Sequence, residues 1–372
     1  MSKPAVTPLM EIGKRRTRIG VSYVREAIGE FYGTLILCFM CVGASAQYHI
    51  KNHDGYESQI VPVLGIILGI MIATVTTGGL SGAHINPAVT VSLAVAGEMS
   101  WLSVPGYVIS QFLGAIVGSL LGWSLVHPIL HNTFVGPLSN LTIMEVDMAQ
   151  DLGIAGIFSP FRDGYTVGNG IATELVLTCF LITTLCAAVD SQSVFKPPKY
   201  LLSIIMPLVI AGFAFSHDMP SGTLLNPARD LGPRIAAWIL GWDAKYVFKS
   251  TDWNGNEQHW WLVGLIGPML GGVLGAFIYS FVIGPQVNLE HLDESNETHD
   301  KKRTEVLAAK PEGDWRSTVF VPKPQQAANG GYPNNNIPNP NGAYQQPQQP
   351  YGGGGYPNQA FNNKGNNNTT VK

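Results

Sequence analysis

The sequence predicts an all-α membrane protein in which six transmembrane helices and two half-helices form an inverted 3+3 repeat. Three observations lead to this fold class. Only 13% of the 372 residues are charged, about half the share usual in soluble proteins. Apolar runs of about 20 residues, long enough to span a hydrocarbon core, recur between residues 24 and 284. A short motif also occurs twice, once in each half of that region.

The regions on either side of the membrane domain, which covers residues 24–284, are polar. Residues 1–23 form an N-terminal arm, and residues 285–372 form a tail that is rich in Asn, Gln, Gly, Pro and Tyr from residue 326 onward. Too few apolar side chains remain in the tail to offset the entropy of ordering, so we expect it to be disordered. Nucleic-acid binders normally have an excess of basic residues, whereas this chain has a net charge of −3. We therefore expect lipid, and not nucleic acid, as its partner.

The apolar runs predict spans over residues 24–48, 59–80, 102–126, 168–189, 200–217 and 260–283. An even number of spans places both termini on the same side of the membrane. Basic residues concentrate in the arm and after the fourth span, where Lys196 and Lys199 lie, whereas the loops on the opposite side offer Lys51 and Arg162. Since cytoplasmic loops carry the excess of Lys and Arg, both termini are expected in the cytoplasm, in a multi-pass protein of the plasma membrane.

This topology assigns a side of the membrane to each glycosylation sequon. Asn140 begins the sequon Asn140-Leu141-Thr142 between spans three and four, and would lie outside, where N-glycosylation is possible. The sequons at Asn296, Asn367 and Asn368 would lie in the cytoplasm and stay unmodified.

The four cysteines fall within the first and fourth predicted spans. Buried thiols of this kind usually serve as small packing residues, and no second half of a paired motif accompanies them. We therefore expect no disulfide, metal site or cofactor. The residues are Cys38, Cys41, Cys179 and Cys186.

Each half of the membrane domain contains a glutamate in its first span and an Asn-Pro-Ala motif after its second. The repeats cover about residues 24–126 and 168–284. Since each contributes three spans, the second copy enters the membrane from the opposite face, and the two motifs approach each other near the midplane. Asn is a good N-cap and Pro suits the first helical position, so each motif should start a half-helix, over about 89–95 and 231–240. The motifs are Asn86-Pro87-Ala88 and Asn226-Pro227-Ala228.

The glutamates, Glu30 and Glu174, are carboxylates within the membrane, which usually have a function. A proton relay is one interpretation. The placement of one Glu per repeat favours the other, in which each carboxylate supports its own loop by accepting backbone N–H groups and turns the loop carbonyls toward an aqueous path.

The paired motifs resemble those of the major intrinsic proteins, the aquaporins. The resemblance rests on Ser81 to Thr90 and on Asn226 to Arg234, and it covers about residues 24–284. Asp230 after Arg229 resembles the aquaglyceroporin branch, as do lengthened loops at about 127–167 and 241–259. In the last span, however, Gly264 stands where that branch usually has Pro.

This resemblance implies a homotetrameric glycerol and water channel with one pore per subunit. The family's filter positions can be assigned in this sequence by their distance along the chain from the two motifs. By this assignment the selectivity filter would consist of Ile66, Ala214, Thr223 and Arg229. Small side chains at two positions make this filter wider than one that passes only water, while the aliphatic Ile66 replaces the usual aromatic wall.

The sequence thus predicts a passive channel for glycerol, other small neutral solutes and water that excludes protons and ions. A water-selective or peroxide-conducting channel is the alternative. A secondary active transporter would also use inverted repeats but needs titratable groups along its path, and a junction protein would not need intact motifs. We find no pairing of nucleophile and base, and so expect no enzyme.

Overall fold

Within the described residues, six helices are long and apolar enough to cross a membrane, in agreement with the predicted spans. The computed structural model describes residues 19–53, 60–136, 139–150, 152–191, 193, 196–218 and 221–287. Most of the expected arm and tail lies outside these residues. The helices are α2 (Ser22–His53), α3 (Ile60–Ser81), α5 (Val104–Phe134), α7 (Val167–Val189), α8 (Lys199–His217) and α11 (Trp261–Ile278), the last of which continues through the π-helix η2 (Tyr279–Ile283) into α12 (Gly284–Val287).

Two shorter helices begin at the prolines of the repeated motif, as predicted. They are α4 (Pro87–Val95) and α9 (Pro227–Leu240). Asn86 and Asn226 precede them with extended backbone, and each side chain accepts the N–H of the alanine two residues later, at 2.8 and 3.0 Å. An N-cap and a first-turn proline therefore start both half-helices in the same way.

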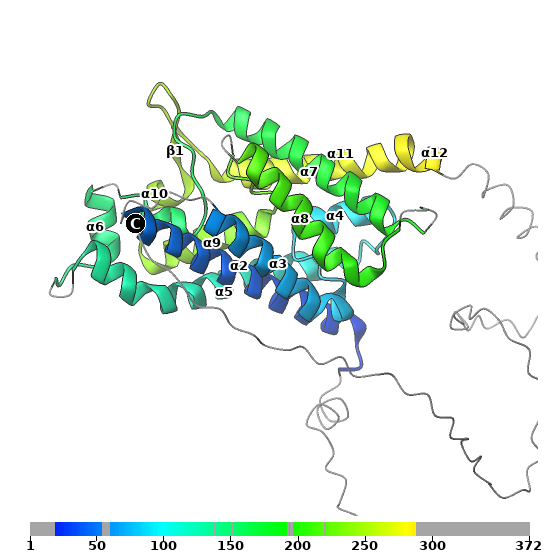
Figure 1. Ribbon diagram of the computed structural model, residues 1–372, viewed down its shortest axis with the longest axis horizontal. Coiled ribbons are helices and arrows are strands. Elements are labelled where there is room, and N and C mark those ends of the chain that lie inside the picture. Colours follow the sequence, from blue (N-terminus) through cyan, green and yellow to red (C-terminus); the bar gives the residue numbers. More distant parts are fainter. Residues whose placement is uncertain are drawn as a thin grey trace, which may run out of the picture. The chain divides into compact units, whose positions relative to one another are not determined.

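The two halves have the same order of elements, α2-α3-α4-α5 and α7-α8-α9-α11. Within each half the first and last helices pack together, while each half-helix packs on the last helix of the other half, α4 on α11 and α9 on α5 (Figure 1). Glycines allow the helices to approach closely, since a Cβ there would meet a backbone carbonyl of the facing helix. These glycines are Gly114 and Gly118, facing Phe31 and Leu35, and Gly271 and Gly275, facing Leu175 and Cys179.

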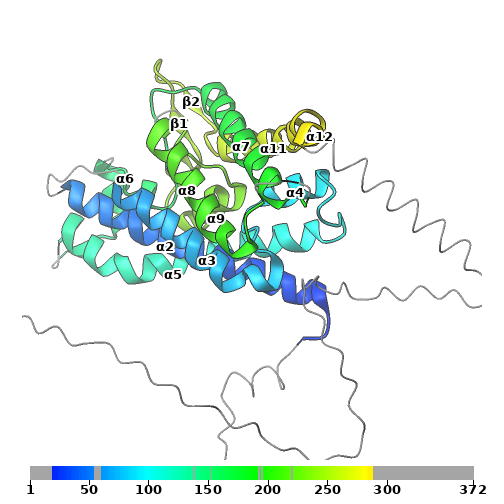
Figure 2. The same ribbon diagram turned by 45° about the vertical axis from the view of Figure 1, so that its right-hand side comes forward.

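The segments expected as long loops contain more regular structure than predicted. Helix α5 continues to Phe134, eight residues past the predicted end of the span, and α6 (Ile143–Gln150) and the 3₁₀ helix η1 (Ile154–Ile157) follow it. The segment between α9 and α11 holds α10 (Ala244–Phe248) and an antiparallel pair of strands, β1 (Ser250–Thr251) and β2 (Glu257–Gln258). All these elements gather at one end of the helices (Figures 1 and 2), which we call the cap end.

The cap end has a hydrophobic core of its own. The rings of Trp123, Phe158 and Trp242 lie with their centroids 5.1–5.4 Å apart, and aromatic pairs at such distances are stabilising. The buried Asp147 accepts the N–H groups of Ile154 and Ala155 and the indole N–H of Trp242. One carboxylate on α6 thus joins η1 to the segment after α9.

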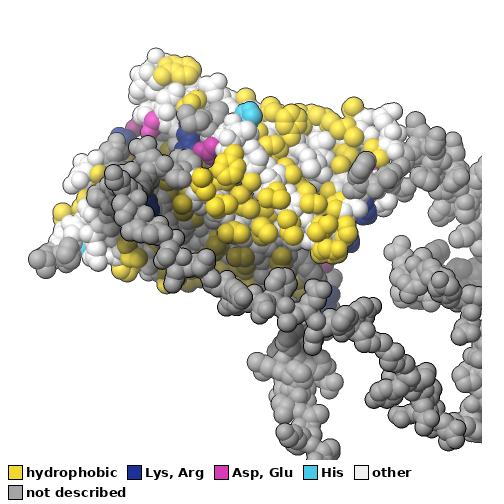
Figure 3. Space-filling model, viewed as in Figure 1, with side chains coloured by type: hydrophobic (Ala, Val, Ile, Leu, Met, Phe, Trp, Pro, Cys, Tyr) yellow, Lys and Arg dark blue, Asp and Glu magenta, His cyan; other side chains and the backbone are white. Residues whose placement is uncertain are grey.

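Hydrophobic side chains cover much of the helical surface that Figure 3 shows. Large apolar residues recur at helical spacing on outward faces, where lipid or another subunit would contact them. Examples are Leu64, Leu68, Ile72 and Val75 on α3, and Ile109, Leu113, Leu121 and Leu125 on α5. The four cysteines are buried in α2 and α7, as expected for packing residues.

Candidate functional site

The two Asn-Pro-Ala motifs meet through a reciprocal pair of hydrogen bonds. The Nδ2 of Asn86 donates to the carbonyl of Leu225 at 2.9 Å, and the Nδ2 of Asn226 donates to the carbonyl of Ile85 at 2.8 Å. Both asparagines are only 6% exposed. Each asparagine therefore caps its own half-helix through Oδ1 and holds the opposite loop through Nδ2.

The loops before the two asparagines adopt the same unusual backbone. Left-handed φ angles occur at Ala83 (51°) and Ile85 (45°) in the first loop, and at Thr223 (49°) and Leu225 (53°) in the second. Residues with a Cβ rarely adopt this conformation, which is costly and persists where surrounding contacts hold it. Strain at matching positions indicates that the conformation belongs to the site.

Glu30 holds the first loop with four hydrogen bonds. Its Oε1 accepts from the Ser81 hydroxyl (2.6 Å) and the His84 N–H (2.9 Å), and its Oε2 accepts from the Ile85 N–H (2.7 Å) and the Gln111 amide (2.7 Å). The side chain is completely buried. Two of the four donors are backbone N–H groups of the loop itself.

Glu174 holds the second loop in the same manner. Its two oxygens accept the N–H groups of Leu224 and Leu225, each at 2.7 Å, and the side chain is completely buried. Leu224 and Leu225 correspond to the two backbone donors of the first loop. The paired glutamates therefore make equivalent backbone contacts, which is what the interpretation as loop supports requires.

Two residues of α5 support the first loop and were not singled out from the sequence. The Gln111 amide bridges Glu30 to the Thr90 hydroxyl at 2.9 Å, and the Tyr107 hydroxyl donates to the Ser81 carbonyl at 2.8 Å. A buried Gln in an apolar span was the available signal, because a buried amide needs partners. His84, next to Asn86 in the loop, contacts Thr90 through Nδ1 at 3.2 Å.

The four residues assigned to the filter come from three helices and one loop. Ile66 on α3 packs against a cluster that includes Cys41 and Ile85, while Ala214 on α8 packs against a different cluster. Thr223 lies in the second loop, and Arg229 in the first turn of α9. Among the described residues, Thr223 Oγ1 and Arg229 Nη1 are buried polar atoms without a hydrogen-bond partner.

Asp230, which the resemblance marks as a branch residue, forms a buried ion pair with Arg234 one turn later, at 2.8 Å. The carboxylate also accepts from the Ser159 hydroxyl, and the Arg234 guanidinium donates to the carbonyls of Val247 and Pro160. The pair thus joins α9 to both segments of the cap end.

Gly264 on α11, the departure noted in the last span, lies against Asp230. A Cβ at this position would overlap the Asp230 carboxylate. Glycine therefore leaves room for the charged group that connects α9 to the cap end.

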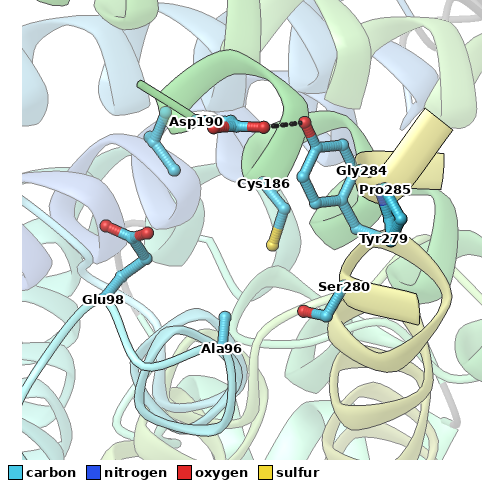
Figure 4. A pocket seen from close by; sticks show the side chains of 9 residues that line it. Ala96, Glu98, Cys186, Asp190, Tyr279, Ser280, Gly284 and Pro285 are labelled. Carbon is cyan, nitrogen blue, oxygen red and sulfur yellow. Dashed lines mark hydrogen bonds between the residues drawn. The ribbon is translucent and has the colours of Figure 1, made fainter. Parts of the chain in front are cut away.

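A cavity of about 300 Å³ lies at the other end of the helices, where α4, α7 and η2 meet (Figure 4). Glu98, Cys186 and Ser280 line it, together with Tyr279, whose hydroxyl donates to Asp190 at 2.7 Å. The filter residues are absent from its lining among the described residues, so we do not assign it to the solute path.

Comparison with known proteins agrees with these features. Residues 18–279 match the family described as Major intrinsic protein. Human aquaporin-9 is 32% identical over 271 residues, which cover 73% of this chain and 86% of that protein. Aquaglycerol porin AQY3 of Saccharomyces cerevisiae is 31% identical over 265 residues, which cover 70% of this chain and 38% of that protein. The solved structure of the aquaglyceroporin from Plasmodium falciparum is 28% identical, with a TM-score of 0.57, and covers 72% of this chain and 99% of that one.

Proposed function

The chain belongs to the major intrinsic protein family, and we propose that it is a passive channel for glycerol, other small neutral solutes and water. The observation that carries the proposal is the reciprocal bonding of Asn86 and Asn226, which brings the N-termini of two half-helices together inside the membrane domain. The similarity to proteins named as aquaglyceroporins supports glycerol as a solute.

The asparagines supply donors to a passing hydroxyl or water oxygen. An amide nitrogen carries two hydrogens, and the bond to the opposite loop uses one of them. We assign the second hydrogen of Asn86 and of Asn226 to the solute. The positive ends of both half-helices meet at the same place, which opposes the passage of protons and cations.

The filter adds a second point of selection. Arg229 supplies N–H donors and a positive charge, Thr223 a hydroxyl, and Ile66 and Ala214 the apolar wall. The buried polar atoms Thr223 Oγ1 and Arg229 Nη1 lack protein partners in the described structure, and unpaired buried polar groups are costly. Hydroxyls of a polyol, or water, would satisfy them.

No step of this transport needs a catalytic residue or a cofactor. A secondary active transporter would require a titratable group along the path, and both intramembrane glutamates are engaged by their loops. A water-selective or peroxide-conducting channel is the alternative within the family, and measured permeabilities decide between them.

We further propose a homotetramer in the plasma membrane, with both termini in the cytoplasm and the cap end outside. Asn140 is exposed just before α6, where an N-glycan would be accessible. In a eukaryotic host, a glycosidase-sensitive mass shift that Asn140→Gln abolishes would support this orientation. A shift that persists in that variant would instead place Asn296, Asn367 or Asn368 outside the cytoplasm.

Swelling of proteoliposomes tests the solute assignment. The wild type should pass glycerol and water, and Ala214→His with Ile66→Phe should narrow the filter and lower glycerol flux far more than water flux. An unpaired polyol hydroxyl costs ~1–3 kcal/mol, or about one to two decades in rate. Exclusion of glycerol by the wild type would refute the glycerol assignment, and an unchanged glycerol-to-water ratio would refute the placement of these residues in the filter.

A further inference from the structure

The segment Ser159–Arg162, between η1 and α7, is fixed residue by residue against the second half of the protein. Ser159 donates to Asp230, and the Pro160 carbonyl accepts from Arg234. The Phe161 ring lies 4.7 Å from the Arg234 guanidinium. Cation–π contact and charged hydrogen bonds thus hold the segment on α9.

The same segment lies directly on the loop that carries Thr223. Gly222 has a left-handed φ of 89°, and a Cβ there would lie 2.6 Å from the Pro160 ring and 3.8 Å from Arg162 Nη2. The backbone of Gly222 and the ring of Pro160 are therefore in close contact, one residue before the filter residue Thr223. Only glycine combines this φ with this space.

Arg162 completes the contact through an ion pair with Asp218, at the end of α8. Asp218 also holds the loop through its backbone, because its carbonyl accepts the N–H groups of Gly222 at 2.8 Å and Ser221 at 3.3 Å. The two charged side chains are 27% and 30% exposed. The ion pair thus joins the Ser159–Arg162 segment to the residue from which the filter loop starts.

The first repeat holds its loop differently. There Tyr107 of α5 donates to the Ser81 carbonyl. Tyr107 lies seven residues before Gly114, and the residue seven before the corresponding Gly271 is Gly264, which has no side chain and makes room for Asp230. The second loop therefore has no tyrosine at the matching position, and Pro160 and Arg162 contact it from the cap end.

From these contacts we infer that Arg162 and Asp218 are positioning residues of the filter, which set the size of solute that passes Thr223 and Arg229. The inference rests on the proposed channel function. Breaking the ion pair would release the Ser159–Arg162 segment from Asp218 and let the loop relax at Gly222. Discrimination against polyols longer than glycerol would then decrease, while the hydrogen bonds of Glu174 to the loop would remain.

Permeabilities of glycerol, the four-carbon polyol erythritol and water, measured in the same proteoliposomes, test the inference. Arg162→Gln and Asp218→Asn should each raise the erythritol-to-glycerol ratio about two- to fivefold, the range expected for a partly exposed ion pair. Arg162→Asp with Asp218→Arg restores an ion pair of reversed sense and should return the ratio toward the wild-type value. Glu257→Gln, which breaks exposed ion pairs to Lys245 and Lys249 at the cap end, is the matched control and should leave the ratio unchanged.

The outcomes separate this inference from the proposed function. A wild type that passes neither glycerol nor water refutes the channel itself. If the wild type conducts, an unchanged erythritol-to-glycerol ratio in both single variants overturns the inference alone. So does an equal loss of all three permeabilities per assembled channel, since that would show a general structural role. Failure of the exchanged pair to restore the ratio would overturn it as well.

Discussion

Replacing the two buried glutamates by glutamine should destabilise the protein unequally. Glu30→Gln and Glu174→Gln keep the shape of the side chain but turn one oxygen into an NH₂ donor. Glu30 accepts four hydrogen bonds, two at each oxygen. Glu174 accepts one backbone N–H of its loop at each oxygen, and the Ser221 hydroxyl contacts the same carboxylate. At position 30 the new amide group faces two donors in either orientation. At position 174 it can turn to the side that the Ser221 hydroxyl does not contact, where it faces one backbone donor.

The magnitude follows from this difference. A hydrogen bond to a charged group contributes ~1.5–3 kcal/mol, so the loss is ~3–6 kcal/mol for Glu30→Gln and ~1.5–3 kcal/mol for Glu174→Gln. Domain stabilities are typically about 5–15 kcal/mol. The first variant should therefore assemble poorly, and the second should assemble with reduced stability. Alanine at either position removes every acceptor and should impair assembly more than solute preference.

The assay combines the yield of folded oligomer, its thermal stability in detergent and the flux per channel, with Glu257→Gln as an exposed-carboxylate control. Glu30→Gln should be the least stable of the three variants. Equal stability of the two buried variants would refute the count of hydrogen bonds. A well-folded Glu30→Ala protein with normal flux would refute the supporting role of the carboxylate.

Three further predictions concern the filter, the tail and the cap end. Thr223 offers no thiol, so mercurials should not block the wild type rapidly, and Thr223→Cys should introduce such a block; if Thr223→Cys in a background without the four native cysteines gains no fast block, the filter assignment is contradicted. Truncation after residue 287 should leave flux per channel unchanged in liposomes, and a loss in correctly assembled protein would show that the tail shapes the pore. The N–H and hydroxyl of Thr142 lower the pKa of Glu145, so this capping contact stabilises α6 at neutral pH and is lost as the pH falls below ~4. Amide exchange in α6 should accordingly be faster in Glu145→Gln than in the wild type at pH 7, and similar in both at pH 3.

The parts of the fold that the sequence predicted are those that local rules determine. Apolar run length located the six spans, and the Asn-Pro pair located the start of each half-helix, because capping depends on residues adjacent in the chain. The hydrogen bonds of Glu30 and Glu174 could be expected because the internal repeat supplied two copies of the same arrangement. A role proposed for the glutamate of one repeat therefore also had to fit the glutamate of the other.

The contacts that were missed join residues whose proximity only tertiary packing creates. Gln111 reaches Glu30 because glycines bring α5 close to α2. Asp147 was not singled out, since its three donors come from η1 and from the residue after Gly241. Neither the hydrophobic periodicity of the sequence nor the spacing of its motifs indicates that such pairs are in contact. The extension of α5 to Phe134 was missed for a related reason, as the cap-end core around Trp123 stabilises residues beyond the apolar run.

The missed contacts also make the two halves of the site unequal in a way that the repeated motif conceals. The first loop is held from within the helices, by Glu30, Gln111 and Tyr107. The second loop has Glu174 within the helices and the Ser159–Arg162 segment on its other side. All filter donors proposed here, Thr223 and Arg229, belong to that second half. The inference about Arg162 and Asp218 therefore predicts that a change in the cap-end segments alters solute selection while the reciprocal asparagine bonds stay intact.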